Sequence, residues 1–76
     1  ADKSVATLSR GYGRKTSGFL WVNDQDNPEK VGDEPLQLAQ KFKSQIQVAV
    51  CEQRALGVHI MLQQKPTLQC IVLDDV

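Results

Sequence analysis

A chain of 76 residues has room for one small domain, because at this length only about 60% of the unfolded surface is buried on folding. The hydrophobic fraction of 41% excludes a wholly disordered chain, and no apolar run approaches the ~20 residues that a membrane-spanning helix requires. Nine basic and nine acidic residues cancel, whereas nucleic-acid-binding domains typically carry a basic excess.

Two strands are expected near the start of the chain. The first covers residues 4–9 (SVATLS), and the second covers residues 18–23, which are rich in the aromatic and β-branched residues that strands favour. The segment between them, residues 10–18 (RGYGRKTSG), contains three glycines, which tolerate positive φ. This segment therefore predicts a hairpin connection or a loop.

A helix is expected in the middle of the chain. Asp33-Glu34-Pro35 is a typical helix start, and Gly57 stands where a helix end favours a left-handed residue. One long helix between these signals is the preferred interpretation. In the alternative, residues 45–50 (QIQVAV) alternate like a strand, so the helix is shorter, ends near Lys43, and the chain has five strands.

The end of the chain is expected to form a second hairpin. Residues 58–63 and 68–74 are apolar segments separated by a turn at Pro66. The predicted fold class is therefore α+β with the order ββαββ. It has one antiparallel four-stranded sheet with a single long helix on one face, and residues 1–76 form one domain.

Several strands are apolar at consecutive positions, so they present apolar side chains to both faces of the sheet. One helix covers one face, and an uncovered apolar face is typical of an interface. The predicted function is a small non-catalytic adaptor that binds a protein partner or a second copy of itself, unless its own loops cover the face. The predicted partner-binding residues are Phe19, Leu20, Trp21, Val22, Met61 and Ile71.

Nucleic-acid binding by the glycine-rich segment 10–18 is the alternative function. Its basic residues can contact phosphates, and its tyrosine can stack on a base. A phosphate-binding P-loop is excluded, because Arg14 stands where the motif requires glycine and no helix is expected to follow. The predicted nucleic-acid-binding residues are Arg10, Tyr12, Arg14 and Lys15.

The sequence contains no complete catalytic motif, so no enzyme, cofactor or metal is predicted. His59 is the sole histidine, and the neighbouring Asp74 and Asp75 are read as solubilising groups, although carboxylates at a strand end bind metals in many enzymes. Cys51 and Cys70 do not have the spacing of a zinc or redox site. We expect them to pack as small apolar residues in a reducing, cytoplasmic compartment, with a bridge between them left open.

Overall fold

The computed structural model describes residues 4–11, 14–42 and 45–74. Its elements follow in the order β1 (Val5–Ser9), β2 (Leu20–Val22), α1 (Pro28–Val31), α2 (Asp33–Lys41), β3 (Gln47–Val50), α3 (Arg54–Gln64) and β4 (Cys70–Asp74). Within the described residues, no helix is both long enough and apolar enough to cross a membrane.

The four strands form one mixed sheet in the order β2-β3-β1-β4. β1 pairs in parallel with both β3 and β4, and β2 pairs antiparallel with β3. The predicted antiparallel sheet of two hairpins is therefore wrong. β1 and β2 do not pair, and neither do β3 and β4, because β3 lies between the first two strands and β1 between the last two. The parallel strands β1 and β3, and β3 and β4, are connected through segments that contain helices.

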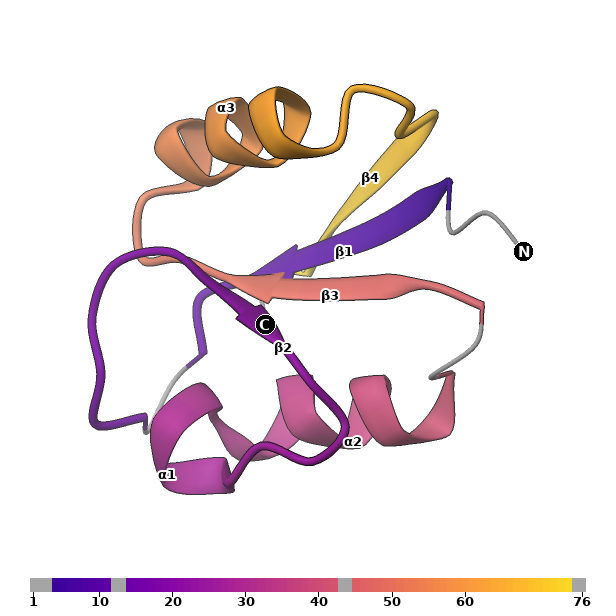
Figure 1. The fold of residues 1–76 in the computed structure, drawn as a ribbon. Helices are drawn as coiled ribbons and strands as arrows, with labels where there is room; N and C mark the ends of the chain where they lie inside the picture. Colours follow the sequence, from indigo (N-terminus) through magenta and orange to yellow (C-terminus); the bar gives the residue numbers. More distant parts are fainter. Residues whose placement is uncertain (1–3, 12–13, 43–44, 75–76) are drawn as a thin grey trace.

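Helices cover both faces of this sheet (Figure 1): α3 lies on one face, and α1 with α2 on the other. Side chains of successive strand residues point to opposite faces, so each central strand has two apolar faces to bury. A core beneath α3 is formed by Ala6, Leu8, Ala49, Cys51 and Met61. The buried apolar residues beyond it include Val31, Leu36, Ala39, Val48 and Val50.

The single long helix predicted over the middle of the chain is also wrong. α2 begins at Asp33, as its capping signal indicates, but it ends at Lys41. β3 (Gln47–Val50) lies where the alternative interpretation placed a strand, although the structure has four strands in its described residues and not five. The strand is favoured because Val48 and Val50 are buried on one face and Ala49 on the other.

The prediction that Gly57 ends a helix is wrong, because Gly57 lies inside a helix. It belongs to the second turn of α3, where the helix packs closely on the sheet. A Cβ atom at this position would lie 2.8 Å from Leu8 Cδ2 and 3.1 Å from Cys51 Cβ. Glycine is needed here for the close approach of α3 to the sheet, and the predicted strand over residues 58–63 is helical.

The apolar run Phe19–Val22 is explained by the two covered faces. Trp21 lies opposite Ala49 and packs against the core beneath α3, while its neighbours Leu20 and Val22 point to the other face. The Trp21 indole also donates a hydrogen bond of 2.6 Å to Gln64 at the end of α3. The expectation that one sheet face is left bare by a single helix is therefore wrong.

Candidate functional site

The carboxyl ends of three parallel strands meet at one edge of the sheet. Ser9, the last residue of β1, lies opposite Val50 of β3 on one side and Asp74 of β4 on the other. In open α/β sheets, ligands bind outside the carboxyl ends of parallel strands. We therefore take this carboxyl edge, with the segments that follow the strands, as the candidate functional site.

Two helices also begin at the carboxyl edge (Figure 1). α3 follows β3 after three residues, and α2 begins at Asp33, next to the segment that follows β1. The amino end of a helix carries unpaired N–H groups and a partial positive charge, which favour anions. The edge thus combines the amino ends of α2 and α3 with the polar residues that follow β1.

Two glycines bring the start of α2 close to the end of β1. Gly11 and Gly32 have φ values of 70° and 96°, which other residues rarely adopt. A Cβ atom on Gly32 would lie 3.3 Å from the Cα of Gly11, and a Cβ atom on Gly11 would lie 3.1 Å from the carbonyl oxygen of Val31. Neither position therefore has room for a side chain larger than the hydrogen atom of glycine. Asp33 is the next residue after Gly32.

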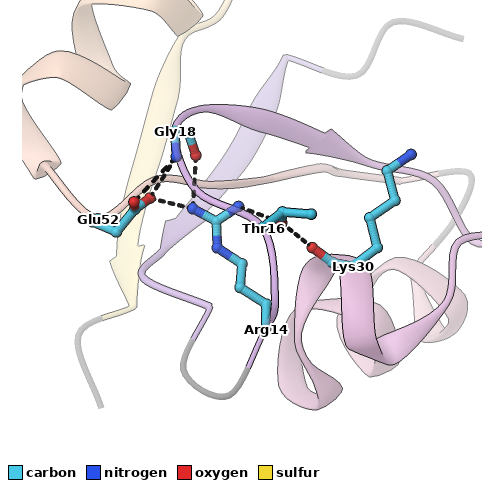
Figure 2. Close-up of polar contacts among 5 residues, drawn as sticks. All are labelled: Arg14, Thr16, Gly18, Lys30 and Glu52. Atoms are coloured by element: carbon cyan, nitrogen blue, oxygen red, sulfur yellow. Dashed lines mark hydrogen bonds and ion pairs between the residues drawn. The ribbon is translucent and has the colours of Figure 1, made fainter.

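A polar network joins the segment after β1 to the segment after β3 (Figure 2). The Arg14 guanidinium donates to the Gly18 carbonyl oxygen at 2.6 Å, to Thr16 Oγ1 at 3.3 Å and to the Glu52 carboxylate. Glu52 also accepts the Gly18 amide with both oxygens, at 3.0 and 3.1 Å. Thr16 donates to the carbonyl oxygen of Lys30 at the end of α1, so three segments are joined.

The network lowers the pKa of the Glu52 carboxyl below its ordinary value. The hydrogen bond from the Gly18 amide is the largest cause, and the charge of Arg14 and its hydrogen bond add to it. Each of these contacts stabilises the ionised carboxylate more than the neutral acid. Glu52 is therefore a charged partner of Arg14 at neutral pH.

The acidic side chains near the edge differ in their partners. Glu52 binds Arg14, and Glu29 forms an exposed ion pair with Lys15 at 2.9 Å. Asp33 is exposed, and its side chain has no hydrogen bond or ion pair to any other described residue. Asp33 and its neighbour Glu34 are thus exposed carboxylates in the first turn of α2, and Asp33 is the one next to the contact between Gly32 and Gly11.

Two buried hydroxyls, those of Thr7 and Ser9, have no hydrogen-bond partner among the described residues. Ser9 ends β1, so it brings an unsatisfied polar group to the carboxyl edge. Among the residues described, no group of three or more His, Cys, Asp and Glu side chains lies close enough to hold a metal ion. Asp75 lies outside the described residues.

The predicted partner-binding residues do not form one exposed face. Met61 is fully buried, and Phe19, Trp21 and Ile71 are partly buried against the core beneath α3. Leu20 and Val22 are half-buried on β2. Binding of a protein partner stays a prediction, although the bare sheet face on which it was based does not exist.

The basic residues of segment 10–18 differ in exposure and in partners. The side chain of Arg14 is 3% exposed and is engaged inside the protein, whereas Lys15 is exposed and paired with Glu29. Arg10 is exposed at the carboxyl edge directly after β1, and Tyr12 lies outside the described residues. The strand β2 follows this segment, and a P-loop would be followed by a helix.

A hollow of about 520 Å³ lies away from the carboxyl edge. Trp21, Val22, Ile46, Val48 and Lys65 contribute to its lining. Val48 lies opposite Val22 near the amino end of β3, so the hollow opens at the end of the sheet opposite Ser9 and Val50. It is therefore separate from the candidate site.

Sequence reasoning missed Asp33 and Glu52 as site residues. The sequence pattern predicts Asp33 as a helix cap, and the single long helix that it favours contains Glu52. The available signal was the position of glycine beside polar residues, in Ser9-Arg10-Gly11 after one strand and in Gly32-Asp33 before a helix. Such segments become informative when the strands are recognised as parallel, since their carboxyl ends then meet.

The chain matches the family model described as "LpxK: Tetraacyldisaccharide-1-P 4'-kinase" over residues 1–76. It is 49% identical over 71 residues to the tetraacyldisaccharide 4'-kinase of Cytophaga hutchinsonii, which covers 93% of this chain and 20% of that protein. It is 46% identical over 72 residues to the corresponding kinase of Bacteroides fragilis, with 93% and 19% covered. The chain spans about a fifth of the length of these curated relatives.

The fold is similar to that of a solved kinase. The crystal structure of LpxK from Aquifex aeolicus in complex with ATP aligns with a TM-score of 0.79 and 35% sequence identity, over 93% of this chain and 23% of that one. The mixed sheet and three short helices match the nucleotide-binding fold of that protein.

These matches overturn the predicted function. The chain is similar to kinases over nearly all its length, so the predictions of a non-enzyme, of a non-catalytic adaptor module and of a nucleic-acid-binding accessory protein are wrong. The physical reason is that the polar residues of the candidate site are far apart in the sequence. Parallel pairing of β1 with β3 and β4 brings their segments to one edge.

Proposed function

Because the chain belongs to the tetraacyldisaccharide-1-P 4'-kinase family, we propose that it forms part of a kinase that transfers a phosphoryl group from ATP to the 4' hydroxyl of a tetraacyldisaccharide 1-phosphate. The observation that carries this proposal is the family match over residues 1–76. The relative from Aquifex aeolicus, which binds ATP and has the same fold here, supports ATP as the donor. The rest of the active site is proposed to come from the remainder of a longer protein, since the relatives are about five times as long.

The carboxyl edge suits phosphoryl transfer for electrostatic reasons. Phosphoryl transfer depends mainly on positioning and on stabilising the charge of the transferred group. The amino ends of α2 and α3 favour anionic oxygens, and Arg10 brings a positive charge to the same edge. The proposal assigns these groups to binding the phosphates of the donor or of the acceptor.

The acceptor hydroxyl must lose a proton when it attacks the phosphorus. Asp33 is an exposed carboxylate at the start of α2 and has no partner in the described part of the chain. It follows Gly32, whose contact with Gly11 holds the start of α2 beside the end of β1. Within this proposal Asp33 takes the proton of the 4' hydroxyl as a general base, while the bond from the γ-phosphorus to its leaving oxygen breaks.

Substitution of Asp33 tests this proposal in the full-length kinase. We expect Asp33→Asn to lower kcat about 100-fold or more, because an amide cannot accept the proton and a positioned base contributes ~10²–10⁴-fold. The measurement is transfer of ³²P from ATP to tetraacyldisaccharide 1-phosphate in mixed micelles. Wild-type protein that phosphorylates no such lipid would contradict the proposed activity.

Glu34→Gln is the matched control, since Glu34 is the next carboxylate on α2 and is also exposed. We expect it to retain activity within about threefold, because no proton transfer is assigned to it. Equal losses in the two variants would remove Asp33 from its role and leave the kinase activity itself standing. A fully active Asp33→Asn enzyme would do the same.

The proposed compartment is the cytoplasm, where ATP is available. Cys51 and Cys70 are both free thiols, which suits a reducing compartment. Fractionation of cells that express a tagged full-length protein tests this placement. We expect the tag in the cytosol or on the cytosolic side of membranes, accessible to protease only after lysis.

A further inference from the structure

The Arg14–Glu52 network differs from the other ion pairs near the carboxyl edge. The Arg14 side chain is 3% exposed although it is charged, and it contacts three different acceptors. The Lys15–Glu29 pair has side chains that are 76% and 67% exposed. Exposed pairs contribute little to a structure, whereas a planar guanidinium with several acceptors restricts geometry. The burial of Arg14 therefore indicates a specific role.

The network connects segments that are distant in the sequence but adjacent at the carboxyl edge. Glu52 lies 38 residues from Arg14 in the sequence, and one residue, Gln53, separates it from the start of α3. Thr16 carries the connection to the carbonyl oxygen of Lys30, 14 residues away, at the end of α1. As Figure 2 shows, Arg14 ties the segment after β1 to Glu52 before α3, and Thr16, which accepts from Arg14, ties it to Lys30 before α2.

Arg14 also touches the glycine contact that places Asp33. A Cβ atom on Gly11 would lie 2.9 Å from Arg14 Cδ, so the aliphatic part of the arginine side chain lies against Gly11. Gly11 in turn contacts Gly32, the residue before Asp33. A shift of the Arg14 side chain would therefore be transmitted through Gly11 to the start of α2.

We propose that Arg14 and Glu52 are positioning residues for phosphoryl transfer. They hold the segment after β1 in place, so that Arg10 and Asp33 keep their positions at the carboxyl edge without Arg14 or Glu52 touching a substrate. This inference rests on the proposed function. A displacement of about 1 Å at a reacting group costs on the order of 100-fold in rate, so such a pair affects turnover from a distance.

The test compares four variants of the full-length kinase: Arg14→Met, Arg14→Lys, Glu52→Gln and the double variant Arg14→Met/Glu52→Gln. We expect Arg14→Met and Glu52→Gln each to lower kcat about 10- to 100-fold, with the KM for ATP changed by less than about threefold. The double variant should be no slower than Arg14→Met, because both changes release the same connection. Lysine keeps the charge but not the fork of donors, so Arg14→Lys should remain slow.

Lys15→Met and Glu29→Gln are the matched controls, because they remove an ion pair of the same loop that is exposed. We expect both to keep kcat within about twofold of wild type. Activity is measured at least 15 °C below the Tm of each variant, so that loss of folded protein does not enter kcat. Since Glu52 is half-exposed, Glu52→Gln remains folded if Arg14→Met does not.

Two kinds of failure are separate in this design. An inactive wild-type protein would overturn the proposed function and this inference together. An active wild type with unchanged kcat in Glu52→Gln would overturn the inference alone, as would equal losses in the controls or additive losses in the double variant. Lower Tm values with unchanged kcat would assign the network to stability only.

Discussion

At the scale of single residues, the lowered pKa of Glu52 predicts how the free energy of unfolding depends on pH. Its pKa is lowered from the ordinary value of 4.5, chiefly by the Gly18 amide and further by Arg14. A carboxyl group whose pKa is lower in the folded state than in the unfolded state stabilises the protein at pH values above its unfolded-state pKa. This stabilisation is lost as the pH falls through the folded-state pKa. The difference in unfolding free energy between wild type and Glu52→Gln should therefore be largest near neutral pH and vanish in acid.

Urea unfolding of both proteins between pH 7 and pH 3 measures this difference, and a difference that grows as the pH falls would contradict it. A carboxyl ¹³C titration separates the two causes. Because the Gly18 amide is the larger one, the pKa of Glu52 should remain below its ordinary value in Arg14→Met, although closer to it than in wild type.

At the scale of secondary-structure elements, the packing of α3 on the sheet depends on Gly57. Alanine favours helices by about 1 kcal/mol over glycine, but overpacking a close contact costs ~1–3 kcal/mol. The added Cβ would lie 2.8 Å from a methyl group of Leu8, which is itself buried. We expect Gly57→Ala to destabilise the protein by about 1 kcal/mol, measured by urea unfolding.

Leu8→Val supplies the control for this contact, since it shortens the side chain that meets the new methyl group. The cost of Gly57→Ala should be smaller in the Leu8→Val background than in wild type. If Gly57→Ala instead stabilises the protein, the gain in helix propensity from alanine outweighs the cost of its close contact with Leu8, and the prediction is wrong.

At the scale of the whole molecule, the sheet has one conspicuous edge. β4 pairs with β1 alone among the described strands, and Val72 and Leu73 are 49% and 43% exposed. An unpaired strand edge with apolar side chains favours association with another strand. We expect the isolated 76-residue chain to self-associate through β4.

Static light scattering measures this association as a mass above 8.5 kDa that rises with concentration. Leu73→Lys, which places a charge on the edge strand, should return the mass toward the monomer. The matched change Leu56→Lys removes a leucine of the same exposure, 43%, on α3 and should not. A monomeric wild-type chain at millimolar concentration would contradict the prediction.

Local signals in the sequence were sufficient for some elements. The sequence predicts strands within residues 4–9, 18–23 and 68–74, and β1, β2 and β4 lie within those ranges. The start of α2 at Asp33 followed from the capping residues. These features depend on neighbouring residues alone, since strand propensity and helix capping are local effects.

The pairing of the strands, the coverage of both sheet faces and the composition of the site depended on contacts between distant residues. Gly57 has the same local appearance whether it ends a helix or packs against Leu8, and the distinction arises from the sheet on which it lies. Likewise, Arg14 meets Glu52 because β1 and β3 are parallel neighbours. A pattern of apolar residues specifies what must be buried but not its partner, so the partner is chosen by packing.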